Sequence, residues 1–381
     1  MILPIVPVVV GLGLMAATSL QLRYWKNTRT LFEHAAQVNP RNSRALAVLG
    51  SLWAAEGDLP RAMELYSQAL SIRADDPETH YLLGNAFEQQ GRLEEAVSHY
   101  TQALWFKPLQ EKTHLALGVV LAKQKKYDEA AAHDRAALAL DAESALAHNN
   151  LARVLQTQGR LEEAIEHYSA ALRSDPTLAP AHNNLGVILL QKGRLAEGTA
   201  QLKEAVRLQP GDYESRYNLA TALNQEHKWT ESADILAPLA ATHGDDPNLD
   251  CQLALALAHS QKTREAMSYY AHALLRQPEF PEALSGLSWI LATDMHPEIR
   301  NAEEAVRMAE GACALTNRKQ APMLMTLAAA YAEAGRFPEA ISVASEALDL
   351  ATKSSQREIQ ANCRDLLETF NSGQPWRERT Q

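Results

Sequence analysis

The strongest constraint on this sequence is a period of 34 residues that recurs along most of its length. The segment from Ala179 to Asp212 is one copy, and it reads as two amphipathic helices joined at Gly193 and closed by Pro210. Glycine takes a positive φ at little steric cost, whereas proline cannot continue a helix interior. A period of this size predicts helix pairs that bury their apolar faces against neighbouring pairs, so we expect an all-α solenoid.

Small and apolar residues keep a fixed register within each unit. In the copy above, small residues stand at positions 8 and 20, a large apolar residue at 24, alanine at 27 and proline at 32: Gly186, Gly198, Leu202, Ala205 and Pro210. This pattern resembles the tetratricopeptide repeat (TPR). The resemblance implies a right-handed superhelix of helix-turn-helix repeats, with a concave groove lined by the first helix of each pair.

The register divides the chain into a half repeat, nine full repeats and two ends. Seven units of 34 residues cover 43–280, and two further units cover 281–354, the first with a loop insertion at Thr293–Asn301. Before them comes a half repeat over 23–42. After them we expect a capping helix over 355–372, because the end of a solenoid needs a polar face, and a disordered tail over 373–381.

An apolar run without charge precedes the repeats. As a helix, the 19 residues from Ile2 to Leu20 would span about 28 Å, close to the roughly 30 Å of a bilayer core. We therefore expect a transmembrane helix over 1–22 and a single-pass protein of the bacterial inner membrane. A cleaved signal peptide and a buried core helix are the alternatives. The basic flank of Arg23, Lys26 and Arg29 favours cytoplasmic repeats only weakly, so the side of the membrane stays open.

Composition excludes several classes of function. The formal net charge of −10 argues against a nucleic-acid partner, which would require a basic stripe. The three cysteines lie far apart and form no CxxC pair. The chain has no P-loop, no GxGxxG after a strand, no HExxH and no GxSxG. We therefore expect no enzyme activity, catalytic residue, cofactor, metal or small-molecule substrate.

A row of amides gives the sharpest functional signal. Position 6 of four successive units carries Asn150, Asn184, Asn218 and Gln252, and position 13 adds Thr157, Gln191 and Gln225. A side-chain amide both donates and accepts, so it can hold a peptide N–H and C=O together. A similar row occurs in the TPR region of O-linked N-acetylglucosamine transferase. These seven residues are our candidates for a groove that binds an extended polypeptide, and local helix contacts are the alternative role.

Histidines and glutamates also recur in register. Position 4 carries His80, His114, His148 and His182, and position 23 carries His99, His133 and His167. Copies in successive units should lie roughly 10 Å apart, too far for shared metal ligation, so we interpret these rings as packing groups. The pairs Glu94–Glu95 and Glu162–Glu163 begin second helices, where the helix dipole favours acidic residues.

A second resemblance concerns the start of the chain. The apolar run followed by WKNTRTLFEHAAQVNPRNSRA and repeats resembles the last membrane helix and TPR region of O-mannosyltransferase-like membrane proteins. The resemblance implies an alternative function, namely the substrate-recognition part of a membrane O-glycosyltransferase (O-mannosyl or O-GlcNAc type) that lacks its catalytic region. Our first hypothesis is a membrane-anchored scaffold that binds a polypeptide segment in its groove, and a third is docking on the convex face.

Overall fold

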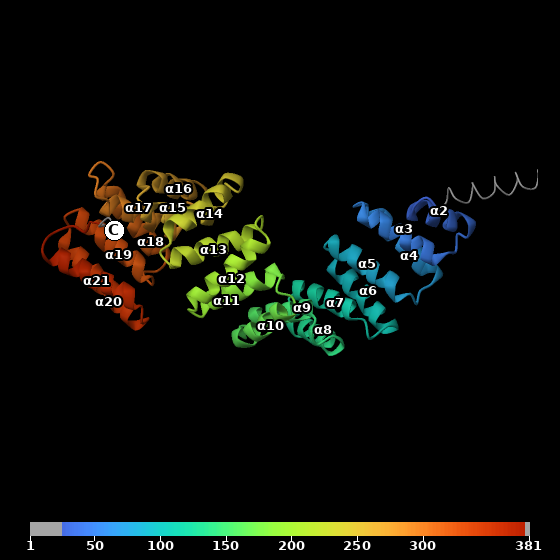
Figure 1. The fold of residues 1–381 in the computed structure, drawn as a ribbon. Helices are drawn as coiled ribbons and strands as arrows, with labels where there is room; N and C mark the ends of the chain where they lie inside the picture. The colour runs from blue at the N-terminus through green and yellow to red at the C-terminus, as the bar shows by residue number, and fades with distance from the viewer. Residues whose placement is uncertain (1–24, 378–381) are drawn as a thin grey trace, which may run out of the picture. The chain divides into compact units, whose positions relative to one another are not determined.

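The computed structural model describes residues 25–377, which form twenty α-helices and no strand (Figure 1). The contacts divide the chain into two compact units, Met1–Ile188 and Leu189–Gln381, here called unit 1 and unit 2. The boundary falls inside α11, Ala179–Gln191. The sequence-based expectation of an all-helical repeat solenoid is confirmed for the described residues.

The helices alternate between first and second members of a pair. The first helices are α3 (Ser43–Ala55), α5 (Pro77–Gln89), α7 (Glu111–Lys123), α9 (Ala145–Thr157), α11 (Ala179–Gln191), α13 (Tyr213–Gln225), α15 (Pro247–His259), α17 (Pro281–Thr293) and α19 (Ala321–Glu333). The second helices are α4 (Leu59–Ile72), α6 (Leu93–Phe106), α8 (Tyr127–Leu140), α10 (Leu161–Ser174), α12 (Leu195–Leu208), α14 (Trp229–Thr242), α16 (Thr263–Arg276), α18 (Ala302–Leu315) and α20 (Phe337–Lys353). Helix α2 (Thr28–Val38) precedes them, and α21 (Arg357–Asn371) follows.

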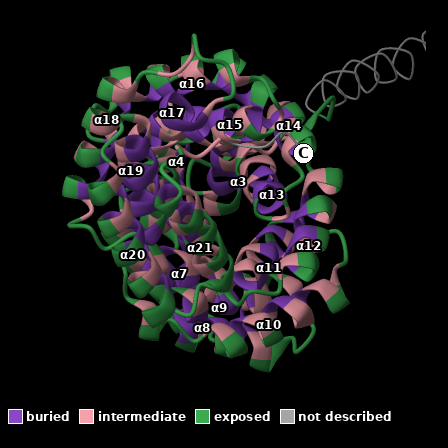
Figure 2. Cartoon of the chain, turned by 90° about the vertical axis from the view of Figure 1, so that its left-hand side faces the viewer, coloured by how far each residue is buried: buried purple, intermediate pink, exposed green. Residues whose placement is uncertain are grey.

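Each pair closes around small residues that let its two helices approach. In the pair α5–α6, Ala96 and Ala103 are fully buried, and the ring of Tyr100 lies over Gly84. A Cβ at Gly84 would lie 2.6 Å from Cε1 of Tyr100, so this position must stay bare. Buried residues line the sides on which helices face one another, while exposed residues mark the outward faces (Figure 2). The periodic small residues are therefore the reason that the helices stack.

The turn within a pair requires a left-handed residue at position 15. Gly193 supplies it with φ of 73°, as expected from the sequence, and Gly91 does so with φ of 72°. Lys125, His227 and Gln261 take the same conformation in other repeats, with φ between 57° and 62°. The turn is thus conserved in geometry even where the sequence lacks glycine.

Unit 2 contains one longer connection and ends in a polar helix. The segment Asp294–Asn301 joins α17 to α18, whereas Ser260–Lys262 joins α15 to α16. Helix α21 buries Cys363, Leu366 and Phe370 against the core of the unit and leaves its opposite face exposed. One amphipathic helix therefore covers the last helix pair.

The C-terminal end of the described chain differs from the simple expectation. A disordered tail was expected from residue 373, yet Trp376 packs against the core of unit 2 and Arg377 bonds to α17 and α19. The charged guanidinium finds acceptors there, which a reading of the tail's polarity alone could not reveal. Residues 378–381 and the expected membrane helix at 2–20 lie outside the described residues. Within 25–377, no helix has both the length and the apolar character needed to cross a membrane.

Candidate peptide-binding groove

The seven candidate groove residues all reach solvent. Each stands at position 6 or 13 of a first helix, which places the two rows on α9, α11, α13 and α15. The position-6 amides are half-buried, namely Asn150, Asn184, Asn218 and Gln252. The position-13 residues are exposed, namely Thr157, Gln191 and Gln225. Half-buried amides flanked by exposed polar groups form a surface that can present hydrogen-bonding atoms.

The row belongs to two separate units, and each part has its own geometry. Asn150, Thr157 and Asn184 lie in unit 1, whereas Gln191, Asn218, Gln225 and Gln252 lie in unit 2. Within unit 2, α13 and α15 pack directly against each other. The Asn224 amide on α13 donates to Oε1 of Gln252 at 3.0 Å and to its backbone oxygen at 3.3 Å. Neighbouring first helices therefore link their polar faces.

Some of the hydrogen-bonding capacity of the row is used locally. Asn183 Nδ2 donates to Oδ1 of Asn184 at 3.4 Å, and the hydroxyl of Thr157 donates to the Arg153 carbonyl at 3.0 Å. Asn184 also bonds to Tyr168, where burial raises the pKa of the phenol and this bond opposes the rise. An amide held by such contacts has a fixed orientation. Local helix contacts were the alternative role for these residues. The residues make such contacts and are also accessible to solvent.

The histidines form pairs that the sequence analysis did not anticipate. The histidine at position 4 of a repeat, on its first helix, contacts the histidine at position 23 of the same repeat, on its second helix. The two rows of histidines are therefore one row of pairs. In each pair the two Nδ1 atoms lie close together. The distance between them is 3.0 Å in His80–His99, 3.0 Å in His114–His133 and 2.8 Å in His148–His167. The shared separation of 19 residues was the available signal.

The tautomers follow from the outer contacts of each pair. Nε2 of His80 lies 2.9 Å from the Ala74 carbonyl, so it carries the proton and donates. In this tautomer, Nδ1 of His80 accepts from Nδ1–H of His99. Burial, followed by the nearby His80, lowers the pKa of His99 to about 4. The two rings of each pair pack against each other, in line with the sequence-based interpretation.

Asp134 is a second feature that sequence reasoning did not explain. It stands at position 24 of its repeat, where other repeats carry the tyrosines Tyr66, Tyr100 and Tyr168. The residue is fully buried, and neither carboxylate oxygen has a hydrogen-bond partner. Burial raises the pKa of Asp134 to about 7, while Arg153 and Arg135 oppose the rise. This repeat therefore buries a carboxyl group where those repeats bury a ring.

The cysteines are buried, and Glu95 is held in an ion pair at a helix start. Burial raises the pKa of Cys251 to about 12 and the pKa values of Cys313 and Cys363 to about 11, so the thiols stay protonated at neutral pH. Glu95 lies in the first turn of α6 and accepts from Arg92 at 2.7 Å, which lowers its pKa. Within residues 25–377, no cluster of three or more potential metal ligands occurs.

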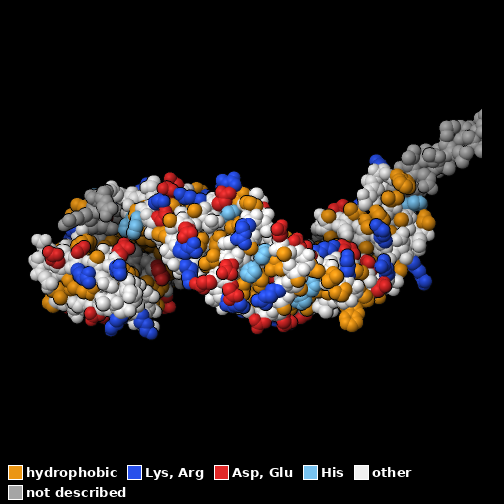
Figure 3. Space-filling view, turned by 60° about the horizontal axis from the view of Figure 1, so that its bottom comes forward, with side chains coloured by type: hydrophobic (Ala, Val, Ile, Leu, Met, Phe, Trp, Pro, Cys, Tyr) orange, Lys and Arg blue, Asp and Glu red, His pale blue; other side chains and the backbone are white. Residues whose placement is uncertain are grey.

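The charged side chains do not gather into a basic stripe on the face drawn in Figure 3. Lysines and arginines alternate there with aspartates and glutamates. Pairs such as Arg160–Glu163 and Arg194–Glu197 place both signs within one helical turn. On this face, basic and acidic side chains are therefore interspersed.

Family models match much of the repeat region. A model described as "TPR repeat" matches residues 50–91, 84–125 and 152–193. Two models described as "Tetratricopeptide repeat" match residues 183–247 and 324–346. No curated protein matches the chain.

Solved structures of other proteins match parts of the chain. A structure titled as a functional characterization of PilF from Pseudomonas aeruginosa is 23% identical, with a TM-score of 0.51, and the match covers 54% of this chain and 94% of that chain. YrrB, described as a TPR protein with an unusual peptide-binding site, is 24% identical over 48% of this chain and 95% of its own, with a TM-score of 0.41. MamA is 22% identical over 42% and 95%, with a TM-score of 0.40.

Helix pairs in fixed register, stacked through small residues, define the class of α-helical repeat solenoids. Within this class, the chain belongs to the tetratricopeptide repeat family, as the matching models and the fold of PilF together show. Its fold is that of a protein-interaction scaffold.

Proposed function

We propose that this protein is a scaffold that captures an extended polypeptide segment along the position-6 and position-13 side of its first helices. One observation carries the proposal: side-chain amides recur at position 6 of α9, α11, α13 and α15, and all four remain partly accessible to solvent. An amide can donate to a peptide C=O and accept from a peptide N–H. Recognition would therefore depend on the backbone of the partner more than on its side chains.

The proposal includes a membrane anchor and no catalytic function. The anchor rests on the uncharged apolar run at 2–20, whose length suits a bilayer. An attached scaffold would hold its polypeptide partner near the membrane surface. The scaffold itself would need no cofactor, since hydrogen bonds and surface contact suffice for capture.

A selection experiment tests the capture of extended segments. A displayed library of random peptides is enriched on the full chain and, separately, on the triple variant Asn150→Ala, Asn184→Ala, Asn218→Ala. We expect enriched peptides with the native chain and loss of that enrichment with the variant, while the circular dichroism spectrum stays the same. Equal enrichment on both proteins would place binding elsewhere, such as the convex face, and would refute the groove.

Exposed amides on the second helices provide the matched control. Gln68 on α4 and Gln102 on α6 stand at position 26 of their repeats, and both are exposed. The double variant Gln68→Ala, Gln102→Ala removes the same chemical group outside the proposed groove. It should enrich the same peptides as the native chain.

A second candidate is the substrate-recognition part of a membrane O-glycosyltransferase. The observation that favours it is the segment from Trp25 to Pro40, whose sequence is similar to the junction between membrane helix and repeats in those enzymes. The groove would then receive serine- and threonine-bearing segments. The genomic sequence upstream of Met1 tests this candidate, which requires further membrane helices in the same reading frame.

A further inference from the structure

The segment that follows α21 folds back onto unit 2. Gly373 reverses the chain with φ of 71°, and its N–H donates to the Phe370 carbonyl at 2.9 Å. The N–H of Gln374 donates to the Thr369 carbonyl at 3.3 Å, which completes the cap of α21. Residues 374–377 then continue without helix and reach α17 and α19.

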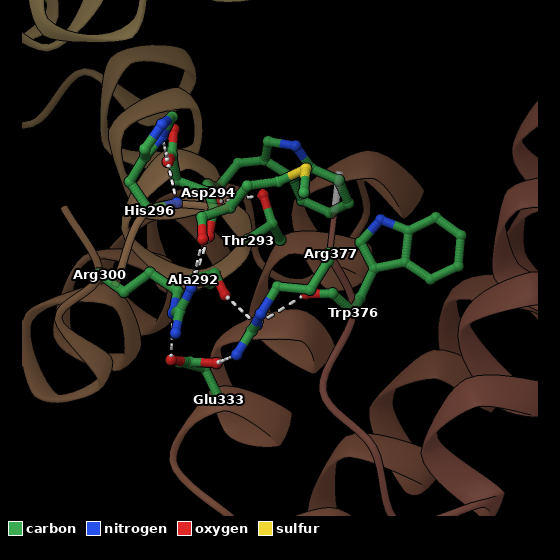
Figure 4. Close-up of polar contacts among 10 residues, drawn as sticks. Ala292, Thr293, Asp294, His296, Arg300, Glu333, Trp376 and Arg377 are labelled. Carbon is green, nitrogen blue, oxygen red and sulfur yellow. Dashed lines mark hydrogen bonds and ion pairs between the residues drawn. The ribbon is translucent and has the colours of Figure 1, made fainter. Parts of the chain in front are cut away.

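Arg377 makes the main polar contacts of this segment. Its Nη2 lies 2.6 Å from Oε2 of Glu333, and its Nη1 donates to the Ala292 carbonyl at 3.3 Å. The close-up shows the guanidinium pointing between these two groups (Figure 4). Beside it, Trp376 is partly buried against the hydrophobic core of the unit. An aromatic residue and an arginine therefore dock as a pair.

The site is suited to arginine by its position at two helix ends. Ala292 and Glu333 lie at the C-terminal ends of α17 and α19, where carbonyls lack intrahelical partners and the helix dipole is negative. The Glu333 side chain is only 13% exposed, and its other oxygen accepts from Nε of Arg300 at 2.9 Å. The two terminal nitrogens of one planar guanidinium reach this carboxylate and the Ala292 carbonyl together, which a single lysine ammonium does less well.

Arg300 links Glu333 to the longer connection. Its Nη1 donates to the carbonyls of Asp294 at 2.9 Å and Met295 at 3.2 Å, in the longer connection between α17 and α18. The insertion that sets this repeat apart therefore orients Glu333 for a second arginine. The other described α-helix pairs lack a connection of this length.

The docking site lies in the register of the proposed groove. Thr293 and Glu333 stand at position 13 of α17 and α19, the register shared by Thr157, Gln191 and Gln225. Helices α17 and α19 pack directly against each other. The segment 374–377 thus lies across two neighbouring first helices, as a bound peptide would.

We propose that the position-13 side of α17 and α19 is a binding site for a polypeptide segment that carries an aromatic residue followed by arginine. Trp376 and Arg377 fill this site within the chain, and a partner segment of the same chemistry must displace them. The inference rests on the proposed function, because it takes the position-13 side as the peptide-binding side.

Tethering gives the internal segment an advantage over a free peptide. A short flexible linker produces an effective concentration in the millimolar range, so a partner present at micromolar concentration competes poorly. Release of residues 374–377 should therefore raise the apparent affinity for a partner by about tenfold or more. The arrangement restricts capture to partners of high affinity or high local concentration.

The test uses a fluorescent peptide with the sequence GQPWRERT, residues 373–380. Its binding is measured by fluorescence anisotropy with the intact chain and with a chain that ends at Gly373. We expect saturable binding to the shortened chain. The intact chain should bind the peptide at least about tenfold more weakly. Glu333→Gln in the shortened chain should remove most of the binding, and so should alanine in place of the arginine that follows tryptophan in the peptide.

Two further variants keep the test decisive. If the shortened chain loses helicity, Arg377→Glu in the intact chain keeps the segment but breaks its ion pair, and it should bind the peptide better than the native chain. Arg336→Ala breaks an exposed pair with Glu339 and should change nothing. Absence of peptide binding to folded protein with the site released would overturn the proposal. A native dimer that Arg377→Glu dissociates would show that a second copy fills the site, which would overturn occupation within the chain.

The outcome is separate from that of the proposed function. The variant Asn150→Ala, Asn184→Ala, Asn218→Ala leaves α17 and α19 untouched and should bind this peptide as the native chain does. Failure of the aromatic–arginine peptide would leave the amide row intact, while failure of the amide row would leave this site intact.

Discussion

Single residues decide how well each repeat closes. Tyr66, Tyr100 and Tyr168 are buried rings at position 24, and glycine or alanine at position 8 of the same repeat leaves room for them. Asp134 breaks this rule although its partner Gly118 keeps the space, since a Cβ there would lie 2.6 Å from Oδ1 of Asp134. The carboxyl group is buried without a hydrogen-bond partner, which costs free energy whenever it is ionised.

Replacement of Asp134 by tyrosine should stabilise the protein. The folded-state pKa of about 7 lies above the ordinary value of 3.8, so the folded chain holds a proton that the unfolded chain releases. The protonated carboxyl group therefore makes its full contribution to stability below pH 3.8, and this contribution is lost as the pH rises through 7. We expect Asp134→Tyr to raise the free energy of unfolding by about 2–4 kcal/mol at pH 8 and by less at pH 5. Thermal unfolding at the two pH values measures this gain.

The control for Asp134→Tyr is Asp134→Asn, which removes the charge without adding a ring. It should recover the pH-dependent part of the gain but not the part due to packing. A melting temperature at pH 8 that stays the same or falls in Asp134→Tyr would show that the site cannot accept the ring.

At the scale of helices, the histidine pairs connect the two members of a repeat. Three successive pairs, α5–α6, α7–α8 and α9–α10, carry the same contact between position 4 and position 23. Protonation of both rings would place two N–H groups face to face. Burial lowers the pKa values of His99, His133 and His167, and the facing histidine lowers them further.

Acid should weaken unit 1 through these pairs. The folded-state pKa of His99, about 4, lies below the ordinary 6.5, so the unfolded chain takes up protons first as the pH falls. The stabilising effect is complete above pH 6.5 and is lost between 6.5 and 4. Between pH 7 and pH 5, the free energy of unfolding should fall in both proteins. We expect the fall to be about 1–2 kcal/mol smaller in the triple variant His99→Leu, His133→Leu, His167→Leu than in the native chain. The partial exposure of the rings limits the effect.

Urea unfolding at pH 7 and pH 5 measures this difference. Both proteins should carry Asp134→Asn, because the buried carboxyl group has a pH dependence of opposite sign. The same loss of stability in both proteins would show that the histidine pairs do not contribute to acid sensitivity.

Much of the element structure followed from the sequence, and the failures have physical causes. The period of 34 residues located the helix pairs, because small residues and turn glycines fix where helices pack and end. The histidine rows were read along the solenoid, although their contacts run across each repeat from His80 to His99. The contacts of Arg377 depend on where a distant loop places Arg300 and Glu333, and no local pattern encodes that arrangement.

At the scale of the whole molecule, each unit presents polar first-helix faces to solvent. The amide candidates were found by register alone, since equal positions in a repeat occupy equal places on their helices. Their local bonds, such as the bond from Asn224 to Gln252, could not be foreseen because both partners are side chains with several acceptors in reach. The handedness of the superhelix and the anchor at 2–20 stay predictions.

Loss of three amides should weaken peptide capture without unfolding the protein. Each side-chain bond to a peptide backbone contributes about 1 kcal/mol, so Asn150→Ala, Asn184→Ala, Asn218→Ala should weaken binding by about 3 kcal/mol, or roughly a hundredfold. Isothermal titration with a library-selected peptide measures the change. The matched variant Gln68→Ala, Gln102→Ala should bind with the native affinity.

The most direct test of backbone recognition is a titration of one selected peptide in two modified series. In the first series, single peptide N–H groups are methylated, and in the second, single side chains are replaced by alanine. If the amides hold the backbone, N-methylation at alternate residues should weaken binding to the native chain by about tenfold per site and hardly affect the triple asparagine variant. Equal sensitivity of both proteins to N-methylation, or dependence on side chains alone, would contradict the account.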